Sequence, residues 1–411
     1  MNTAAPPKPM LGLDEAVQRL VAATVAIGET QQLPTLDALG RVLAVDLASP
    51  LDVPPLDNSA MDGYALRAAD VPQAGVVLPI SQRIAAGQVG QPLAPGSAAR
   101  IFTGAPVPEG ADAVVMQELC ESAGDGVRVN AVPRAGQAIR RRGEDVSCGA
   151  VVLRRGTRLT PQALGLAATI GTASLSVVRR PRVALFSTGD ELVMPGGPLR
   201  AGAIYNSNRY MLRGLLQALG CEVSDLDIVP DRLDATREAL RSAARGHDLI
   251  VSSGGVSVGE EDHLKPAVQT EGRLDLWQIA IKPGKPLAFG EVYNQESRAA
   301  LFIGLPGNPV SSFVTFVLAV RPVLQALQGM AHQPPRGLPL RADFDWPKAD
   351  SRREFLRVRR NADGGLELYP NQGSGVLTSV AWSDGLVDNP PGQVIRAGDV
   401  VRFLPYAELL A

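Results

Sequence analysis

The chain has 411 residues, which is too long for a single hydrophobic core, so we expect about two to four domains. Hydrophobic residues make up 45% and charged residues 20% of the sequence, the composition of an ordinary globular protein. The net charge of −2 argues against sequence-independent binding of nucleic acid. The three cysteines are scattered and form no CxxC pair, which argues against a zinc site and fits a reducing cytoplasm.

The N-terminal region predicts part of a small helical platform. Asp14 can cap a helix whose Val17, Leu20 and Val21 share one face, and residues 35–44 predict a second short helix. The proline-rich N-terminus before them carries no apolar signal core, so we expect a cytoplasmic protein.

A β-rich segment interrupts this platform. From residue 76 to residue 118, short β runs alternate with glycine and proline, which is typical of a small β domain. A helical pattern returns at residues 160–170. We therefore expect a discontinuous platform at residues 1–50 and 134–180, with a β domain inserted at residues 51–133.

An uncharged run at residues 159–178 is long enough to be a candidate membrane span. Pro161, Gly165 and Gly171 interrupt it. We interpret it as a short buried helix, a glycine stop and a strand, so no membrane partner is predicted.

From residue 181 onward, strands and helices alternate. Strands at residues 183–187, 222–229 and 248–253 are separated by helical patterns, and further strands at 274–281 and 287–290 precede an apolar helix at 309–327. Successive strand–helix–strand units predict a mostly parallel sheet with right-handed crossovers. We therefore expect an α/β domain at residues 181–331.

A proline-rich linker follows this domain. Beyond it the sequence has β alternation, glycine turns and few helical stretches. We therefore predict a small β-barrel-like domain at residues 332–411.

The loop after the strand at residues 248–253 has the composition of an anion-binding turn. Ser253 is followed by Gly254 and Gly255, and glycine lets a backbone turn at positive φ and lets a ligand approach bare N–H groups. Three carboxylates at residues 260–262 follow, as an Mg²⁺-bridged phosphate would require. In an isolated loop, a glycine turn with an acidic helix cap would explain this pattern better.

Two more glycine turns flank this loop in the predicted sheet. One lies in STGDEL at residues 187–192, and the other in GLPGNPVSS, where Pro306 lies in the turn and Pro309 suits the first helical position. The N–H groups of residues 310–312 would then face outward at a helix start, which is an anion site. Because ligands bind at the carboxyl ends of strands in open α/β sheets, we expect the three loops to converge on one crevice.

Long motifs occur along the chain in a characteristic order: DNSAMDGYA, RIFTGAPVPEGADAVV, RRRGED, STGDEL, SSGGVSVGEED, IKPGKP and GLPGNPVSS. In these motifs the chain closely resembles the molybdopterin molybdenumtransferases, a family that includes the C-terminal domain of gephyrin-type proteins. The resemblance runs from the first predicted helix to the C-terminus. It implies a helical platform, an inserted β domain, a three-layer α/β domain and a C-terminal β-barrel, assembled as homodimers.

The resemblance also implies an activity. Molybdate is inserted into the dithiolene of adenylylated molybdopterin, and AMP leaves with the help of Mg²⁺, which gives the molybdenum cofactor. The substrates are therefore adenylylated molybdopterin and molybdate, and the implied protein partners are the molybdopterin adenylyltransferase and molybdoenzyme-specific chaperones.

Several predicted residues suit this chemistry, because cleaving a pyrophosphate requires charge neutralisation. Glu191, Asp231 and Asp262 each follow the carboxyl end of a strand, where they could hold Mg²⁺ or orient water. Lys282 and Lys285 lie in a proline-stiffened turn and could hold phosphate or molybdate as point charges. Asp231 could instead simply cap the helix after it.

Family positions complete the expected site. Asp62, Thr103 and Asp145 match positions needed for activity, so we expect catalytic roles for them with Glu191, Asp231 and Asp262. RREFLR and QGSGVLTS resemble stretches that help to hold molybdate, although Arg357 could be an ordinary surface charge and Thr103 could hold a turn. The expected substrate-binding residues are Ser253, Gly254, Gly255, Lys282, Lys285, Pro306, Pro309, Ser311, Arg357 and Ser374.

Some features leave alternatives open. Gln278 stands where some family members carry a lysine, which lowers the expected positive charge of that strand. Three arginines beside two acids at residues 140–145 could form a solvated salt-bridged turn or line an anionic site. A scaffold or binding protein that retains the fold is the main alternative function. The adenylyltransferase step is less well supported, because its enzymes are much shorter.

Overall fold

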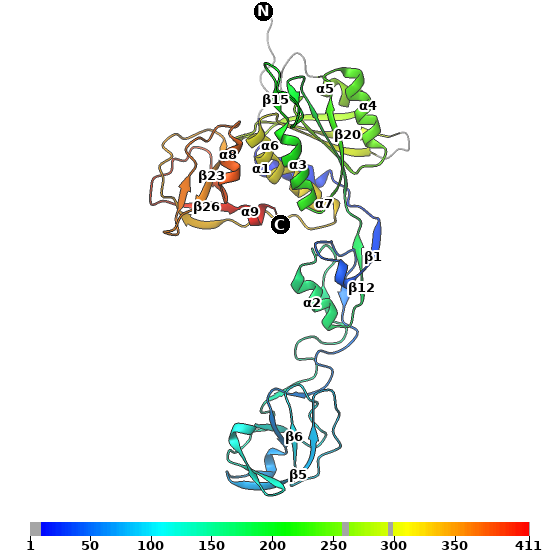
Figure 1. Cartoon of the computed structure of the whole chain (residues 1–411), viewed down its shortest axis with the longest axis vertical. Coiled ribbons are helices and arrows are strands. Elements are labelled where there is room, and N and C mark those ends of the chain that lie inside the picture. The colour runs from blue at the N-terminus through cyan, green and yellow to red at the C-terminus, as the bar shows by residue number, and fades with distance from the viewer. Residues whose placement is uncertain (1–9, 257–262, 295–298, 411) are drawn as a thin grey trace, which may run out of the picture. The chain divides into compact units, whose positions relative to one another are not determined.

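The computed structural model describes residues 10–256, 263–294 and 299–410, and Figure 1 traces them. The chain divides into two units. The large unit comprises Met1–Gln31, Gly40–Ala44 and Val177–Ala411, and the small unit comprises Gln32–Leu39 and Val45–Ser176. The four domain ranges expected from the sequence are finer than this division and stay a prediction.

A mixed sheet forms the centre of the large unit, in the order β16-β13-β17-β21-β20-β18. The first four strands in that order run parallel to one another, and the last two are antiparallel to their neighbours, so the mostly parallel sheet is confirmed. The strands are β13 (Arg182–Thr188), β16 (Glu222–Val229), β17 (Leu249–Ser253), β18 (Gly272–Gln278), β20 (Pro286–Tyr293) and β21 (Ala299–Leu305).

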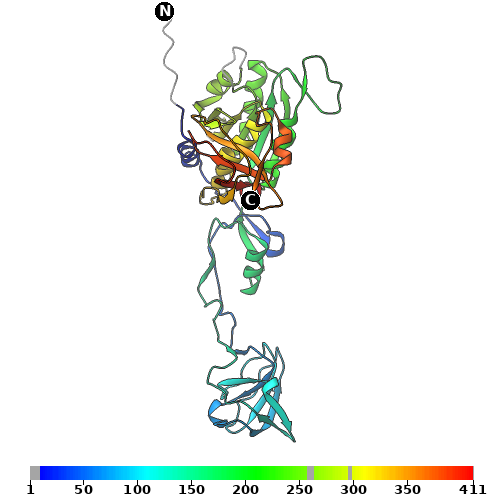
Figure 2. The same cartoon turned by 90° about the vertical axis from the view of Figure 1, so that its left-hand side faces the viewer.

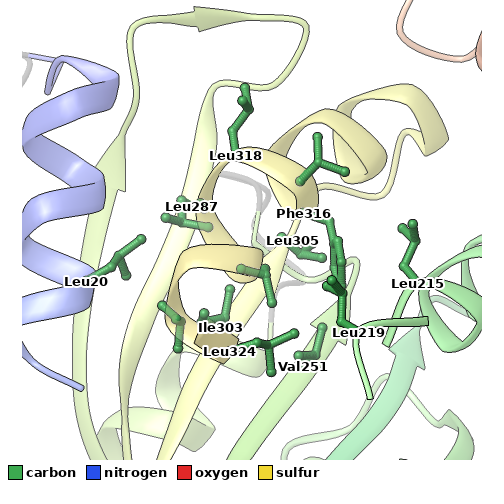
Figure 3. Packing of buried hydrophobic residues seen from close by; sticks show 14 of the residues in the cluster. Leu20, Leu215, Leu219, Val251, Leu287, Ile303, Leu305, Phe316, Leu318 and Leu324 are labelled. Carbon is green, nitrogen blue, oxygen red and sulfur yellow. The ribbon is translucent and has the colours of Figure 1, made fainter. Parts of the chain in front are cut away.

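Helices cover both faces of this sheet, which confirms the three-layer arrangement. The strands are apolar on both faces: Val183 and Leu185 belong to one core cluster, whereas Ala184 and Phe186 belong to the other. The helices that pack into the first cluster are α1 (Leu13–Ala22), α3 (Ser207–Ala218), α6 (Pro309–Thr315) and α7 (Arg321–Leu327). Helices α4 (Leu233–Ala244) and α5 (Leu264–Glu271) pack into the second. Figure 3 shows the first cluster around Ile303 and Phe316.

The apolar helix predicted at residues 309–327 is formed, with a π-helical turn at Phe316–Val320 between α6 and α7. Pro309–Leu327 is long and apolar enough to cross a membrane by length and composition, and 94% of the apolar window is buried inside the protein. It packs as a core helix of the large unit, because every residue from Val310 to Val320 is buried.

A second sheet of the large unit has the order β19-β23-β25-β26-β22, with β24 paired to β23, and Figure 2 shows its C-terminal part in orange and red. Its strands are β19 (Ile281–Lys282), β22 (Leu338–Arg341), β23 (Arg353–Arg360), β24 (Leu366–Leu368), β25 (Gly385–Asn389) and β26 (Val400–Pro405). Helices α8 (Leu377–Trp382) and α9 (Tyr406–Leu409) accompany it. Since β19 precedes the KPGKP turn, this turn is tied directly to the C-terminal sheet.

The small unit contains the predicted β domain, a sheet in the order β7-β4-β6-β5-β9-β8. Its strands are β4 (Gly63–Leu66), β5 (Val76–Ile84), β6 (Ala98–Ile101), β7 (Ala113–Met116), β8 (Cys120–Ala123) and β9 (Gly126–Val129). Helix α2 (Pro161–Thr169) begins at Thr160, whose side chain accepts a hydrogen bond from the Ala163 N–H.

Short strand pairs complete the fold. They are β1 (Thr30–Pro34) with β12 (Ser174–Val178), β2 (Leu47–Ala48) with β11 (Val151–Leu153), β3 (Asn58–Ser59) with β10 (Ile139–Arg140), and β14 (Leu192–Val193) with β15 (Ile204–Tyr205).

The helix expected at residues 35–44 is wrong. The structure has only a 3₁₀ turn at Thr35–Asp37. Gly40 ends any continuation because its φ of +72° lies in the left-handed region. Leu36 and Leu39 within this range are 89% and 55% exposed, so they bury no helix face.

Candidate active site

The carboxyl ends of β13, β17 and β21 lie side by side in the large unit. The Gly254 N–H donates to the Leu305 carbonyl at 3.1 Å. A Cβ on Gly254 would lie 2.5 Å from the Thr188 carbonyl oxygen, and one on Gly307 would lie 3.9 Å from the Gly254 Cα. The predicted convergence of the three glycine turns is therefore present.

Gly254 and Gly255 are required by this convergence. Their φ angles are +93° and +67°, a region that other residues rarely adopt. A Cβ on Gly255 would lie 2.8 Å from Thr188 Oγ1. The pair therefore forms a turn that glycine adopts without strain and that a residue with a Cβ would not fit, as expected for a loop that lets a ligand approach its backbone.

Asn208 links two of these loops, and sequence reasoning missed it. Its Nδ2 donates to Ser253 Oγ and to the Gly307 carbonyl, both at 2.7 Å. Neighbouring Asn206 accepts from the Arg209 N–H and so caps α3. A polar residue on the same helix face as the buried Leu212, Leu215 and Leu216 was the available signal.

Unpartnered polar atoms gather around the same edge of the sheet. A buried polar group without a hydrogen bond costs about 1–3 kcal/mol, so native proteins rarely keep several together. Among the described residues, the buried side-chain atoms without a partner near these loops are Thr188 Oγ1, Asn206 Nδ2, Asn208 Oδ1, Ser252 Oγ, Ser312 Oγ and Thr315 Oγ1. This concentration is what a site for a polar ligand would show.

The helix start at Pro309 is not the open anion site that the sequence predicted. Pro309 does occupy the first turn of α6, and Ser311 is buried within it. However, the Val310 N–H donates to the Ser374 carbonyl at 3.0 Å and the Ser312 N–H donates to the Asn308 carbonyl at 2.9 Å. Two of the three expected donors are therefore already used, and the first of them joins α6 to the loop that contains Ser374.

Arg357 lies beside that loop and is not a surface charge. It is 1% exposed, and its Nη1 donates to the Phe355 carbonyl at 3.0 Å. Its Nε donates to Ser379 Oγ at 3.2 Å and its Nη2 to the Gly373 carbonyl at 3.4 Å. Burial lowers the pKa of Arg357 to about 10. Within the described part of the chain, no salt bridge to a carboxylate is formed by this guanidinium.

The KPGKP turn packs against α6. A Cβ on Gly284 would lie 2.7 Å from Thr315 Oγ1 and 3.4 Å from the Ser311 carbonyl. Lys285 is exposed, whereas Lys282 donates from Nζ to Glu354 Oε1 at 2.9 Å. Lys282 is therefore paired within the protein while its side chain stays 42% exposed, and the predicted role of both lysines as point charges for the substrate stays a prediction.

The predicted metal ligands are only partly described. Glu191 folds back over Gly189, where a Cβ would lie 2.6 Å from its Oε2. The Asp231 N–H donates to Asp190 Oδ1 at 3.4 Å. The N-cap residue of α4 is Arg232, so Asp231 is not its N-cap. Asp262 lies outside the described residues, and within them no group of three or more His, Cys, Asp or Glu is arranged for a metal ion.

In the small unit, Asp62 and Thr103 form a pair across two loops. Asp62 Oδ1 accepts from the Thr103 N–H at 2.8 Å and from its Oγ1 at 2.7 Å. The backbone hydrogen bond and then the hydroxyl lower the pKa of Asp62, because both stabilise the carboxylate. These two hydrogen bonds therefore favour the ionised carboxylate of Asp62 and fix the orientation of its side chain.

We expect Thr103→Val to raise the pKa of Asp62 toward its ordinary value, because the hydroxyl donor is lost while the backbone donor remains. Thr103→Ser, which keeps both donors, should titrate as the wild type does. The measurement is the pH titration of the Asp62 carboxyl carbon by NMR. An unchanged midpoint in Thr103→Val would show that the hydroxyl does not stabilise this carboxylate.

The arginine run beyond Ile139 forms exposed ion pairs. Arg141 Nη1 lies 2.6 Å from Asp57 Oδ2, and Arg142 Nε lies 2.6 Å from Asp52 Oδ2. These two arginines therefore form the exposed ion pairs that the solvated salt-bridged turn predicts, and a role in an anionic site stays untested. The Asp145 N–H donates to the Val53 carbonyl at 2.9 Å, which fixes its backbone and leaves the predicted role of its side chain untested.

Comparison with known proteins identifies the family. Three family profiles match the chain in order: "MoeA N-terminal region (domain I and II)" at residues 11–171, "Probable molybdopterin binding domain" at 184–326, and "MoeA C-terminal region (domain IV)" at 339–406. A Haemophilus influenzae protein named molybdopterin molybdenumtransferase is 41% identical over 98% of this chain and all of its own length. A Mycobacterium tuberculosis protein named molybdopterin molybdenumtransferase 2 is 38% identical over 93% of this chain and 96% of its own.

Solved structures agree. The crystal structure of the molybdopterin biosynthesis moeA protein from Pyrococcus horikoshii matches with a TM-score of 0.82 and 30% identity, over 97% of this chain and 100% of that one. The site-bearing loops of both units lie within the matched ranges. The chain therefore belongs to the molybdopterin molybdenumtransferase family.

Proposed function

We propose that the chain is a transferase that inserts molybdenum from molybdate into adenylylated molybdopterin, with release of AMP. The observation that carries the chemistry is a group of features in the large unit. Glycine turns and unpartnered buried polar atoms lie at one edge of the central sheet. The buried cation of Arg357 lies on β23, beside the loop whose Ser374 carbonyl accepts from the start of α6. The relatives named as transferases favour this enzyme over a scaffold of the same fold.

Three groups of residues in the large unit have different roles in this proposal. The Gly254–Gly255 turn offers close backbone approach, as a phosphate-bearing substrate needs. Asn208 holds this turn and the Gly307 loop in register. Arg357 supplies a positive charge in a low-dielectric setting, where attraction for an oxyanion such as molybdate is stronger than in water.

Magnesium fits the acidic end of this site. Mg²⁺ in proteins is commonly bound by one or two carboxylates together with substrate phosphates and water. Glu191 and Asp231 would hold it with Asp262, and oxygen donors are the type that this ion prefers. When bound, the ion would neutralise charge that develops on the leaving phosphate.

We expect removal of magnesium with a chelator to lower molybdate-dependent AMP release roughly 100-fold or more, since a metal supplies several kcal/mol of charge stabilisation. AMP is quantified by chromatography after mixing enzyme, adenylylated molybdopterin and molybdate. Restoring excess Mg²⁺ should restore the rate. A rate that is the same with and without chelator would reject the metal requirement and leave the transferase assignment standing.

The homodimer remains part of this proposal and rests on the family resemblance. The same holds for the adenylyltransferase and the chaperones as protein partners. The cytoplasmic location also remains part of it, and rests on the scattered cysteines and on an N-terminus without an apolar signal core.

A further inference from the structure

A buried carboxylate connects the C-terminal sheet to the KPGKP turn. Glu354 on β23 is 1% exposed. Its Oε1 accepts from Lys282 Nζ at 2.9 Å, and its Oε2 accepts from Trp346 Nε1 at 2.8 Å and from Asn389 Nδ2 at 3.4 Å. Trp346 and Asn389 therefore hold this carboxylate from within the C-terminal region, and Lys282 reaches it from β19, the strand that pairs with β23 at the edge of the same sheet.

Lys282 is held from two sides. Besides Glu354, its Nζ lies 3.2 Å from Asp350 Oδ2. Asp350 in turn accepts from Arg352 Nε at 3.1 Å. Burial alone would lower the pKa of Lys282, but the bonds to Glu354 and Asp350 outweigh it and raise that pKa. The ammonium thus stays charged, and its charge is neutralised within the protein.

Lys285 has the opposite environment. Its side chain is exposed, and in the described part of the chain no carboxylate forms an ion pair with it. Only its backbone is anchored, because the Ile279 N–H donates to its carbonyl at 2.8 Å. Between the two lysines, Gly284 packs against Thr315 and the Ser311 carbonyl, so the turn has little freedom to shift.

We infer that Glu354 is a positioning residue: it anchors the KPGKP turn through Lys282 and leaves Lys285 as the ammonium that contacts the oxyanion substrate. The inference deepens the proposed function and rests on it for the identity of the oxyanion. Glu354 acts through Lys282 and does not touch substrate. A pair of lysines that look equivalent in sequence is therefore divided into one anchor and one binding group.

Molybdate titration by calorimetry separates these roles. Lys285→Met should weaken molybdate binding roughly tenfold, because a charge-assisted contact is lost. Lys282→Met and Glu354→Gln should each weaken it less and by the same factor, and the double variant should equal either single one, because they break one linkage. Glu367→Gln removes a carboxylate from an exposed pair with Arg359 and should leave binding unchanged.

Chemical labelling reports the anchor without any activity. At a pH near 8, Lys282 should react with acetic anhydride more slowly than Lys285, as followed by mass spectrometry, since its pKa is raised and its Nζ is held. Glu354→Gln should speed labelling of Lys282, whereas Glu354→Asp should restore slow labelling and Glu367→Gln should not change it. Thermal unfolding confirms that each variant is folded.

The outcomes are distinct. The inference is overturned if the losses of molybdate affinity in Lys282→Met and Glu354→Gln add up in the double variant. It is also overturned if Lys282→Met loses as much affinity as Lys285→Met while Glu354→Gln loses none. Either result would show that Lys282 contacts molybdate directly. Unchanged Lys282 labelling in Glu354→Gln would also overturn the inference. If the wild type binds no molybdate, the proposed function and the role of Lys285 fail, while labelling still decides whether Glu354 anchors Lys282.

Discussion

Gly254→Ala should abolish almost all molybdenum transfer. The added Cβ would lie 2.5 Å from the Thr188 carbonyl oxygen, and the residue would keep a φ of +93°. Left-handed backbone alone costs a non-glycine residue roughly 1–2 kcal/mol. The contact with a backbone oxygen can be relieved only by moving the ends of β13 and β17 apart. Because a misplacement of about 1 Å can cost roughly 100-fold in rate, we expect a loss of at least that size.

A matched glycine variant separates the effect of backbone strain from the effect of the position in the site. Gly364 has a φ of +77°, and a Cβ there would meet nothing within 4 Å. Gly364→Ala should therefore lower thermal stability somewhat and leave the rate of molybdate-dependent AMP release intact. If Gly254→Ala retains the rate of Gly364→Ala, the close approach of these loops has no part in the reaction.

Arg357→Met should weaken the binding of molybdate while the fold is kept. The guanidinium is buried, and burial lowers its pKa to about 10. Since the folded-state pKa lies below the ordinary value of an arginine, the charge costs the unligated protein free energy at every pH below about 10. That cost falls as the pH rises above 10. An oxyanion bound beside the guanidinium would offset it, so binding and stability are linked.

Thermal unfolding with and without molybdate measures this linkage. The wild type should gain stability on adding the oxyanion, and Arg357→Met should gain little, with an affinity loss of roughly tenfold to 100-fold. Arg359→Met is the control, because Arg359 lies on the same strand but is exposed and paired with Glu367. A molybdate-dependent gain in Arg357→Met as large as that of the wild type would exclude Arg357 from the site.

The parts of the fold that local chemistry determines could be predicted from the sequence. Apolar strands that end in glycine predicted both the sheet and the edge at which its loops meet, because Gly254 and Gly255 have no substitute at positive φ. Gly220, which follows the end of α3, has a φ of +83° for the same reason.

The parts that depend on distant partners could not be predicted. Asn208 is 45 residues from Ser253 and 99 from Gly307, and Lys282 is 72 residues from Glu354. No periodic pattern in the sequence indicates which distant residues will form such pairs. The same reason explains the error at Val310, whose N–H was expected to be open and is taken by the Ser374 carbonyl.

Arg357 is a residue whose role the sequence indicated but whose burial it did not. Its family motif indicated a role in holding molybdate, but a strand residue in RREFLR could equally have faced solvent. Only the packing of β23 against α8 buries it and makes the charge costly. A site residue of this kind is recognised by its environment, not by its position in a motif.

The most direct test of the account is the delivery of molybdenum itself. The purified chain is incubated with adenylylated molybdopterin, Mg²⁺ and molybdate, and the product is offered to a molybdoenzyme that was prepared without its cofactor. The account predicts that molybdenum appears in that enzyme and activates it, in proportion to the AMP released and only when the chain is present. Equal activation without the chain, or AMP release without molybdenum transfer, would contradict it.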